Sequence, residues 1–409
     1  MKQILLTIKA LSPLAIGLKK PGSVSEANDY IPGAAIRGAI AAAMLQQSGQ
    51  PKADFSQGDN DFKTLFLGEK AAVFCNAYPI AADSETEVRV LPSTAVSSKT
   101  NPGFKPKGNG VFDTLIDRFC AEGYGQLYDP NCPVDWGRVE PHSAFYSLSK
   151  DKFKSESKFK SHSVDKRILT RVGINRRRAT AEEEILYSLE VLSEVQGKDK
   201  EAALYQSSIF LEDEELANLL VQFINSHSFR LGGAASRGLG KVEIQAEVRE
   251  PQETVNSRIG QFNEALISRW NSWEIFGQPQ NELDKNRTYF TLDLQSDAIL
   301  EEDWRRTTVI TPEMLCDFAG ASYDSLQLHV AYSSYDYRSG WNSAWGLMKD
   351  VELITNKGAV YLFSTAAIEK WIPALQTLEF RGVGERTEEG FGQLQVCNEF
   401  HLVFREDAV

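Results

Sequence analysis

A glycine-rich loop that occurs twice, each time after a helical pattern and before a strand pattern, constrains the fold of this chain most. The first copy, RLGGAASRGLGKVEI at 230–244, follows apolar residues at helical spacing and runs into an alternating strand. The second copy, RGVGERTEEGFGQLQV at 381–396, has the same neighbours, and its Gly390 lies 152 positions after Gly238. Upstream, we align Gly384 with Gly233, which places one extra residue in the second copy. Repetition of a helix, a loop and a strand indicates an internal duplication.

The two halves also share an opening strand pattern and are joined by a predicted helix. ILLTIKAL at 4–11 and YFTLDLQ at 289–295 both alternate as β-strands do. ETVNSRIGQFNEALISRWNSW at 253–273 places its apolar residues on one helical face, which predicts a packed helix rather than a loose tether. We therefore expect an α+β chain with a first domain at 1–250 that carries a large basic insertion at about 97–200, a linker helix in 251–285 and a second domain at 286–409.

Charge is segregated along the chain. The 409 residues carry a formal net charge of −12, which by itself argues against nucleic-acid binding. Residues 150–178, however, contain eleven lysine or arginine residues against three acidic ones, so this stretch is +8 and the remainder is −20. A basic face on an acidic body would give this segregation. A solvated flexible loop that binds nothing is the alternative, and charge alone favours it.

Composition excludes several classes of protein. Hydrophobic residues make up 42% of the chain, but no apolar run approaches the ~20 residues that span a bilayer. The N-terminus lacks the apolar core of a secretory signal, which predicts a cytoplasmic protein with its five scattered cysteines reduced. Cys120, Cys132 and His142 fall short of the usual four zinc ligands, so we predict free thiols, no metal and no cofactor.

The glycine-rich loops do not match the known nucleotide-binding loops. A Walker-type loop needs GxxxxGK followed by Ser or Thr, whereas Ala235 holds the first glycine position and Val242 follows Lys241. The order helix, loop, strand also excludes a dinucleotide-binding turn. Glycines still let backbone amides surround an anion, and Arg230, Arg237 and Lys241 add positive charge, which favours a phosphodiester. A tight packing loop is the alternative.

Three longer stretches resemble a known family. DYIPGAAIRGAI at 29–40 resembles the turn into the first helix of the RAMP superfamily of CRISPR–Cas proteins. INRRRATAEEEILYSLEVL at 174–192 and SGWNSAWGLMKDVELITNKGAVYLF at 339–363 are similar to the large two-domain RAMP subunit of subtype III-D effector complexes. The resemblance implies two ferredoxin-like (RRM-like, βαββαβ) domains in tandem. It also implies a guide-RNA-binding structural subunit of a type III effector in antiviral defence.

The resemblance further implies partners and an RNA-binding surface. Guide RNA and the other effector subunits are the expected partners, target RNA is an indirect one, and no membrane is involved. Arg37 is expected one turn into the first helix, where it could reach a phosphate near the loop. The second half lacks the IPG turn, so its RNA face is expected to be altered. The predicted RNA-binding residues are Arg37, Arg171, Asn175, Arg176, Arg177, Arg178, Arg230, Gly232, Gly233, Arg237, Gly238, Gly240, Lys241, Arg381, Gly384, Arg386, Gly390 and Gly392.

Catalysis is the question that the sequence leaves open. Relatives that process guides generally use a histidine near the first helix, and here only His162, in the basic stretch, is a candidate. Target-cleaving relatives use an aspartate in the loop before the IPG turn, and Asp29 lies there, although carboxylates are also common turn residues. Three hypotheses follow: a structural guide-binding subunit, an endoribonuclease that acts on precursor guide or target RNA, and a protein scaffold whose loops merely pack.

Overall fold

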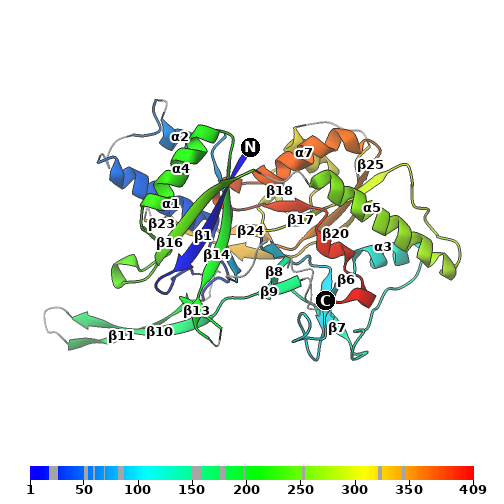
Figure 1. The fold of residues 1–409 in the computed structure, drawn as a ribbon, viewed down its shortest axis with the longest axis horizontal. Coiled ribbons are helices and arrows are strands. Elements are labelled where there is room, and N and C mark those ends of the chain that lie inside the picture. The colour runs from blue at the N-terminus through cyan, green and yellow to red at the C-terminus, as the bar shows by residue number, and fades with distance from the viewer. Residues whose placement is uncertain are drawn as a thin grey trace.

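The computed structural model describes residues 1–17, 26–49, 54–58, 60–68, 70–81, 87–148, 159–175, 180–197, 199–250, 254–320, 325–342 and 346–409. They form a mixed α+β fold in which two sheets lie side by side, each covered by helices (Figure 1). Within these ranges, no helix is both long and apolar enough to cross a membrane.

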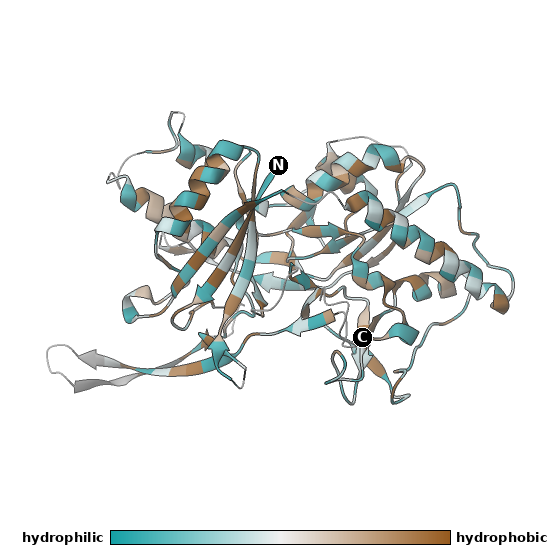
Figure 2. Ribbon diagram, viewed as in Figure 1, coloured by the Kyte–Doolittle hydropathy of each residue, from teal (hydrophilic) through white to brown (hydrophobic). Residues whose placement is uncertain are grey.

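The first half is built on an antiparallel sheet. Its elements are β1 (Lys2–Ala10), α1 (Gly33–Gln47), α2 (Asp61–Phe66), β2 (Val73–Phe74), β3 (Tyr78–Ile80), β14 (Leu204–Leu211), α4 (Glu214–Ser226), β15 (Phe229–Arg230) and β16 (Lys241–Arg249). The strands lie in the order β16-β1-β14-β2, and β1 pairs along most of its length with both neighbours. Exposed and buried residues alternate along β16, as do the hydrophilic and hydrophobic colours of that strand in Figure 2. The buried face packs against α1 and α4.

The second half repeats this strand order. Its elements are α5 (Val255–Ser272), β17 (Thr288–Leu294), β18 (Leu300–Glu302), β19 (Arg305–Thr307), α6 (Pro312–Ala319), β20 (Gln327–Tyr332), β25 (Val360–Thr365), α7 (Ile368–Arg381) and β26 (Leu394–Val396). The sheet runs β26-β17-β25-β20. Within each sheet the four strands therefore lie in the spatial order fourth, first, third, second. Along the chain, a helix lies between the first and second strands and between the third and fourth.

Both halves carry additional strands between their second and third sheet strands, and the first half also carries a helix there. In the first half these are β4 (Arg89–Val90), β5 (Ala95–Ser98), β6 (Val111–Asp113), α3 (Leu115–Gly123), β7 (Val139–Pro141), β8 (Phe145–Leu148), β9 (Phe159–His162), β10 (Lys166–Asn175), β11 (Thr180–Leu192), β12 (Val195–Gln196) and β13 (Glu201–Ala202). In the second half they are β21 (Tyr335–Arg338), β22 (Trp341–Asn342), β23 (Leu347–Met348) and β24 (Glu352–Thr355). The β10–β11 hairpin projects away from both sheets (Figure 1).

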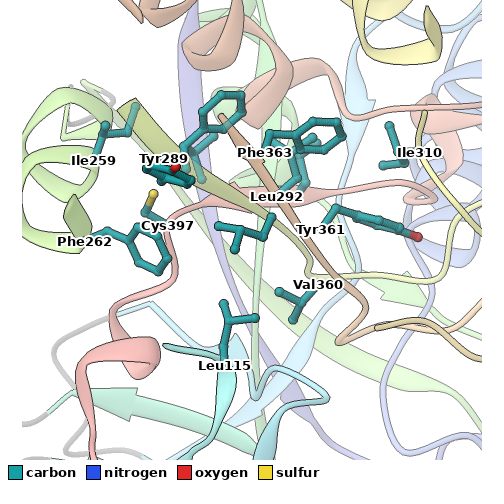
Figure 3. Close-up of a cluster of buried hydrophobic side chains, with 14 of the residues drawn as sticks. Leu115, Ile259, Phe262, Tyr289, Leu292, Ile310, Val360, Tyr361, Phe363 and Cys397 are labelled. Carbon is teal, nitrogen blue, oxygen red and sulfur yellow. The ribbon is translucent and has the colours of Figure 1, made fainter. Parts of the chain in front are cut away.

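The core of the second half includes a helix contributed by the first half. Leu115 and Cys120 of α3 are buried in one cluster with Phe262 of α5 and with the strands β17 and β25 (Figure 3). Burial raises the pKa of the Cys120 thiol to about 12. The insertion therefore folds back onto the second sheet and ties the two halves together.

The C-terminal segment adds an ionic contact to this packing. His401 is fully buried, with Nε2 2.8 Å from Asp293 Oδ1 of β17 and Nδ1 3.1 Å from Asp113 Oδ1 of β6. Burial alone would lower the pKa of His401, but the two carboxylates raise it to about 10. The protonated imidazole therefore bridges the insertion of the first half and the sheet of the second.

Candidate nucleic-acid interface

The first glycine-rich loop joins β15 to β16 and is mostly exposed. Ala234 adopts a left-handed conformation with φ 56°, a short 3-10 turn covers Ala235–Arg237, and Gly238 follows with φ 84°. Arg237 and Gly238 face solvent. The chain needs glycine at position 238 for its positive φ, since a Cβ there would meet nothing within 4 Å.

The second loop has the same backbone conformation. Arg386 is left-handed with φ 56°, a 3-10 turn covers Thr387–Glu389, and Gly390 has φ 94°. The equivalence extends upstream to Gly384, with φ 82°, and Gly232, with φ 84°. The alignment of Gly384 with Gly233 is therefore wrong: the two loops have equal length and no residue is inserted.

The upstream glycines are required by close packing within each half. A Cβ on Gly232 would lie 2.5 Å from the carbonyl oxygen of Ala15, and a Cβ on Gly384 would lie 2.3 Å from that of Ile299. In both loops the following amide donates a hydrogen bond of 2.9 Å to the same carbonyl. Each loop is thus hydrogen-bonded to the segment that follows the first strand of its own half.

The downstream glycines have the same explanation. A Cβ on Gly240 would lie 2.5 Å from the carbonyl oxygen of Leu231, and a Cβ on Gly392 would lie 1.8 Å from that of Val383. Intramolecular contacts therefore account for four loop glycines: Gly232, Gly240, Gly384 and Gly392. Any contact with RNA must come from exposed groups around this scaffold.

The first loop faces the projecting hairpin. The Arg237 guanidinium donates a hydrogen bond of 2.6 Å to the hydroxyl of Tyr187 on β11, and lies 5.5 Å from the centre of that ring. Arg171 on β10 stands directly opposite Tyr187 in the strand ladder. Arg230 donates to the carbonyl of Leu239 at 3.0 Å. The structure thus brings the loop and the hairpin together.

The structure describes some, but not all, of the other residues predicted for this surface. Lys241 is exposed at the start of β16. Asn175 pairs with Thr180 at the end of the described part of the hairpin. Arg176, Arg177 and Arg178 lie outside the described residues. The hairpin also exposes apolar side chains, with Ile168 at 68% and Leu186 at 70% exposure.

The second loop, in contrast, is packed between the two halves. It lies against β2 and the start of α1, where a Cβ on Gly33 would come within 2.9 Å of the carbonyl oxygen of Glu389. A Cβ on Gly390 would lie 2.7 Å from Oδ1 of Asn76, and the same oxygen accepts a hydrogen bond of 2.9 Å from the Gly33 amide. Gly390 and Gly392 are buried.

The cations of the second loop have carboxylate partners. Arg386 forms an ion pair with Glu389 and lies over the Phe391 ring at 5.0 Å. Burial would raise the pKa of Glu389, but Arg386 and Lys349 hold it below its ordinary value. These partners leave the Arg386 side chain directed at the protein rather than at a ligand.

Arg381 and Arg37 also form hydrogen bonds within the protein. Arg381 bonds Glu212 at 2.7 Å and the carbonyl of Ala71 at 3.3 Å, which joins α7 to the first half. Arg37 donates a hydrogen bond of 2.5 Å to the carbonyl of Phe66 at the end of α2 and lies over its ring. Arg37 lies one turn into α1, as expected, and its cation satisfies the C-terminus of α2.

Asp29 lies in a pocket between the halves. Its side chain is 47% exposed, and Oδ1 lies 3.8 Å from Nζ of Lys357. The pocket has a volume of about 270 Å³ and is lined by Ala27, Asn28, Asp29, Tyr30, Lys166, Asp297, Asp336, Tyr337, Arg338, Ile354, Asn356 and Lys357. It therefore combines the loop before α1 with the β21–β24 hairpin.

The other candidate residues are buried or dispersed. His162 is buried on β9 with Nε2 2.8 Å from the hydroxyl of Ser147, so it is not on an exposed basic surface. Cys120 and Cys132 are buried free thiols, and His142 is half-buried. Among the residues described, no three His, Cys, Asp or Glu side chains cluster in a way that could hold a metal ion.

A family profile described as "RAMP superfamily" matches residues 7–243, which is more than half of the chain. The chain belongs to the RAMP superfamily. No curated protein is significantly similar to it.

Solved structures similar to this RAMP protein include two from type III-B Cmr-beta complexes. One complex is bound to cognate target RNA and AMPPnP, and the match has 11% identity, covers 90% of this chain and 88% of the other, and has a TM-score of 0.40. The apo complex gives 13% identity, 60% and 96% coverage and a TM-score of 0.30. Oligomeric Cmr4 from Pyrococcus furiosus gives 13% identity, 61% and 99% coverage and a TM-score of 0.26.

Several residues around the first loop and the pocket of this RAMP protein could not be predicted from the sequence. Tyr187 is one aromatic residue in a long alternating strand, and Lys357 lies in a turn more than 300 positions from Asp29. Arg338 and Tyr30 meet across the halves, with Nη1 2.7 Å from the hydroxyl. The duplication implied two similar units, but no local pattern paired these residues.

Proposed function

We propose that this RAMP protein is a guide-RNA-binding structural subunit of a type III CRISPR–Cas effector complex. The strand order of both sheets, with a helix after the first and third strands, supports two ferredoxin-like domains in tandem. We place them at 1–250 and 286–409, with the linker helix in 251–285. Its partners would be guide RNA and other effector subunits, with target RNA reached indirectly, in the cytoplasm.

The contact between Arg237 and Tyr187 is the observation that carries this proposal. It places the Arg237 cation beside an aromatic ring, and Arg171 lies across the ladder from that ring. Lys241 is exposed at the end of the same loop. Proteins that bind single-stranded RNA combine basic grooves with aromatic side chains on which bases stack. Among the described residues, neither Arg237 nor Lys241 has a carboxylate partner, so both remain available to phosphates.

The glycines have a supporting role in this proposal. Because Gly232 and Gly240 are explained by internal packing, we assign RNA contact to the side chains on the loop rather than to its glycines. Amides that already bond to carbonyls of the same half, such as those of Gly233 and Gly240, cannot also bond to a phosphate.

A salt titration tests the proposal. The full chain is incubated with labelled single-stranded RNA and the dissociation constant is measured by filter binding at increasing salt. Arg237→Ala with Lys241→Ala is expected to reduce the slope of log K against log salt by about 1.4, since each phosphate contact contributes about 0.7. Arg249→Ala, at the opposite end of β16, is the matched control and should leave the slope unchanged. RNA binding with no salt dependence would contradict the proposal.

A second candidate function is cleavage of RNA at Asp29. It is favoured by one observation, the half-exposed carboxylate of Asp29 in a pocket beside Lys357. A carboxylate in such a position could accept the proton of a ribose 2′-hydroxyl. A cleavage assay with Asp29→Ala separates the two functions.

A further inference from the structure

Arg338, Asp297 and Tyr30 form a hydrogen-bonded ionic group at the base of the pocket between the halves. Arg338 Nη2 lies 2.8 Å from Asp297 Oδ2, and its Nη1 donates to the hydroxyl of Tyr30. Asp297 Oδ1 in turn accepts a hydrogen bond of 3.0 Å from the backbone amide of Lys357. Tyr30 and Asp297 are buried. These groups satisfy one another, so they shape the pocket without offering free hydrogen bonds.

Two charged groups on the wall of the pocket are not satisfied in this way. The Asp29 carboxylate and the Lys357 ammonium are 3.8 Å apart, which is too far for a hydrogen bond. Lys357 Nζ instead lies over the rings of Tyr30, at 5.1 Å, and Phe145, at 5.7 Å. Neither group forms a hydrogen bond with another described residue. Both keep their hydrogen-bonding capacity for a ligand in the pocket.

A further cation and an aromatic ring complete the lining. Lys166 Nζ donates to the carbonyl of Ala27 at 2.6 Å, which uses one of the three donors of its ammonium. Tyr337 is 48% exposed, so its ring is accessible to a planar group. The pocket thus presents an acceptor, two cationic donors and an aromatic surface within about 270 Å³.

We propose that this pocket binds an unpaired guanine base. Guanine carries two adjacent donors, N1–H and N2–H, that match one carboxylate, and two adjacent acceptors, O6 and N7, that match a lysine. N1 and O6 are neighbours on one edge of the base, as Asp29 and Lys357 are neighbours on the wall. Adenine and cytosine offer a carboxylate only their single exocyclic amino group, and uracil offers only N3–H. Tyr337 would stack on the base.

The source of the guanine rests on the proposed function, because an RNA-binding subunit meets unpaired bases in a guide. A free guanine nucleotide shares the same chemistry. Both sources place the base between Asp29 of the first half and Lys357 of the second, so the pocket needs both halves.

Fluorescence anisotropy with the full chain tests this proposal. The probes are labelled oligouridine RNAs that are identical except for one central guanosine, adenosine or cytidine, and competitors are GMP and UMP. The guanosine RNA is expected to bind about 5- to 150-fold more tightly than the all-uridine RNA, as for one good base contact. Asp29→Asn should abolish that preference. Glu264→Gln, an exposed carboxylate on α5, is the matched control and should keep the preference.

The outcomes separate the pocket from the RNA-binding role. Equal binding of all four RNAs, together with equal competition by GMP and UMP, would overturn the guanine pocket while leaving RNA binding intact. If no RNA binds but isothermal titration calorimetry shows that GMP binds more tightly than UMP and that Asp29→Asn loses this preference, the pocket stands and the proposed function falls. A guanosine preference that persists in Asp29→Asn would also overturn the proposal.

Discussion

The two glycine-rich loops of this chain share a backbone conformation and differ in what surrounds them. In the first loop Arg237 and Gly238 are exposed and face a projecting hairpin. In the second loop Gly390 and Gly392 are buried, and Gly390 packs against Phe74 and Asn76 of the first half. The loop geometry is therefore a property of the duplicated fold, maintained by close backbone packing, and is not by itself evidence of a ligand.

The charges around the loops show what the difference means for function. Arg381 and Arg386 of the second half are paired with carboxylates inside the protein. Arg237 and Lys241 of the first half have no such partner among the described residues. Duplication thus allowed one loop to become part of an interface between domains while the other kept its cations available to solvent. The second loop serves as an internal control for the first.

The largest effect is expected where the packing is tightest. Gly392→Ala places a Cβ 1.8 Å from a backbone carbonyl, so the free energy of unfolding should fall by at least about 3 kcal/mol. Gly238→Ala meets open space and should cost only about 1–2 kcal/mol for its positive φ. Urea unfolding of both variants measures the difference. Equal losses would mean that crowding does not distinguish the two positions.

A second test concerns the three arginine residues that follow β10 in the sequence, Arg176, Arg177 and Arg178. Changing Arg176, Arg177 and Arg178 together to alanine is expected to lower the salt slope of guide binding by about 2–3 units. The melting temperature should stay the same if these side chains are solvated. An unchanged slope would show that the stretch is a solvated loop that binds nothing.

Replacing Arg386 of the second loop should lower the free energy of unfolding and leave RNA binding unchanged. Arg386→Ala leaves the half-buried Glu389 with Lys349 as its remaining partner, at 3.2 Å. The expected loss is about 1.5–3 kcal/mol, as for a hydrogen bond to a charged group. RNA affinity per folded molecule and its salt slope should remain those of the wild type. A reduced slope would place Arg386 in the RNA-binding surface and remove the contrast between the loops.

The packing between the halves should also weaken at alkaline pH. His401 has a pKa of about 10 in the folded protein and an ordinary value of 6.5 when unfolded, so the folded state binds the proton more tightly. Its stabilising contribution is therefore complete below pH 6.5 and is lost as pH rises toward 10. Melting temperatures measured between pH 6.5 and 10 should fall less steeply for His401→Gln than for the wild type. Identical slopes would contradict the bridging role of His401.

The smallest effect is expected for cleavage. Asp29 belongs to the loop before α1, the helix whose start is covered by the second glycine-rich loop. Asp29→Ala should leave the melting temperature and the ladder of target-RNA products in the assembled complex unchanged, with or without magnesium. Loss of one product, with assembly intact, would assign the nuclease function to this subunit.

Much of the architecture was accessible from the sequence because it depends on local periodicity and on repetition. The helical spacing before each loop and the alternation after it predicted α4, β16 and α7 correctly, and the repeated GxG placed the two loops in equivalent positions. The alignment upstream failed by one residue at Gly233. Two adjacent glycines look alike in sequence, and only φ and the contact with a carbonyl distinguish Gly232 as the equivalent of Gly384.

The sequence by itself determined the duplicated unit and the positions of its glycines, since a strand, a helix and a positive φ are set by residues close together in the chain. The tertiary structure alone decided which loop is exposed, which arginines are free and which residues share the pocket. Arg37 and Arg381 differ from Arg237 only in their neighbours, and those neighbours come from parts of the chain far away in sequence. Burial and pairing of a charge depend on such long-range contacts, and no local pattern encodes them.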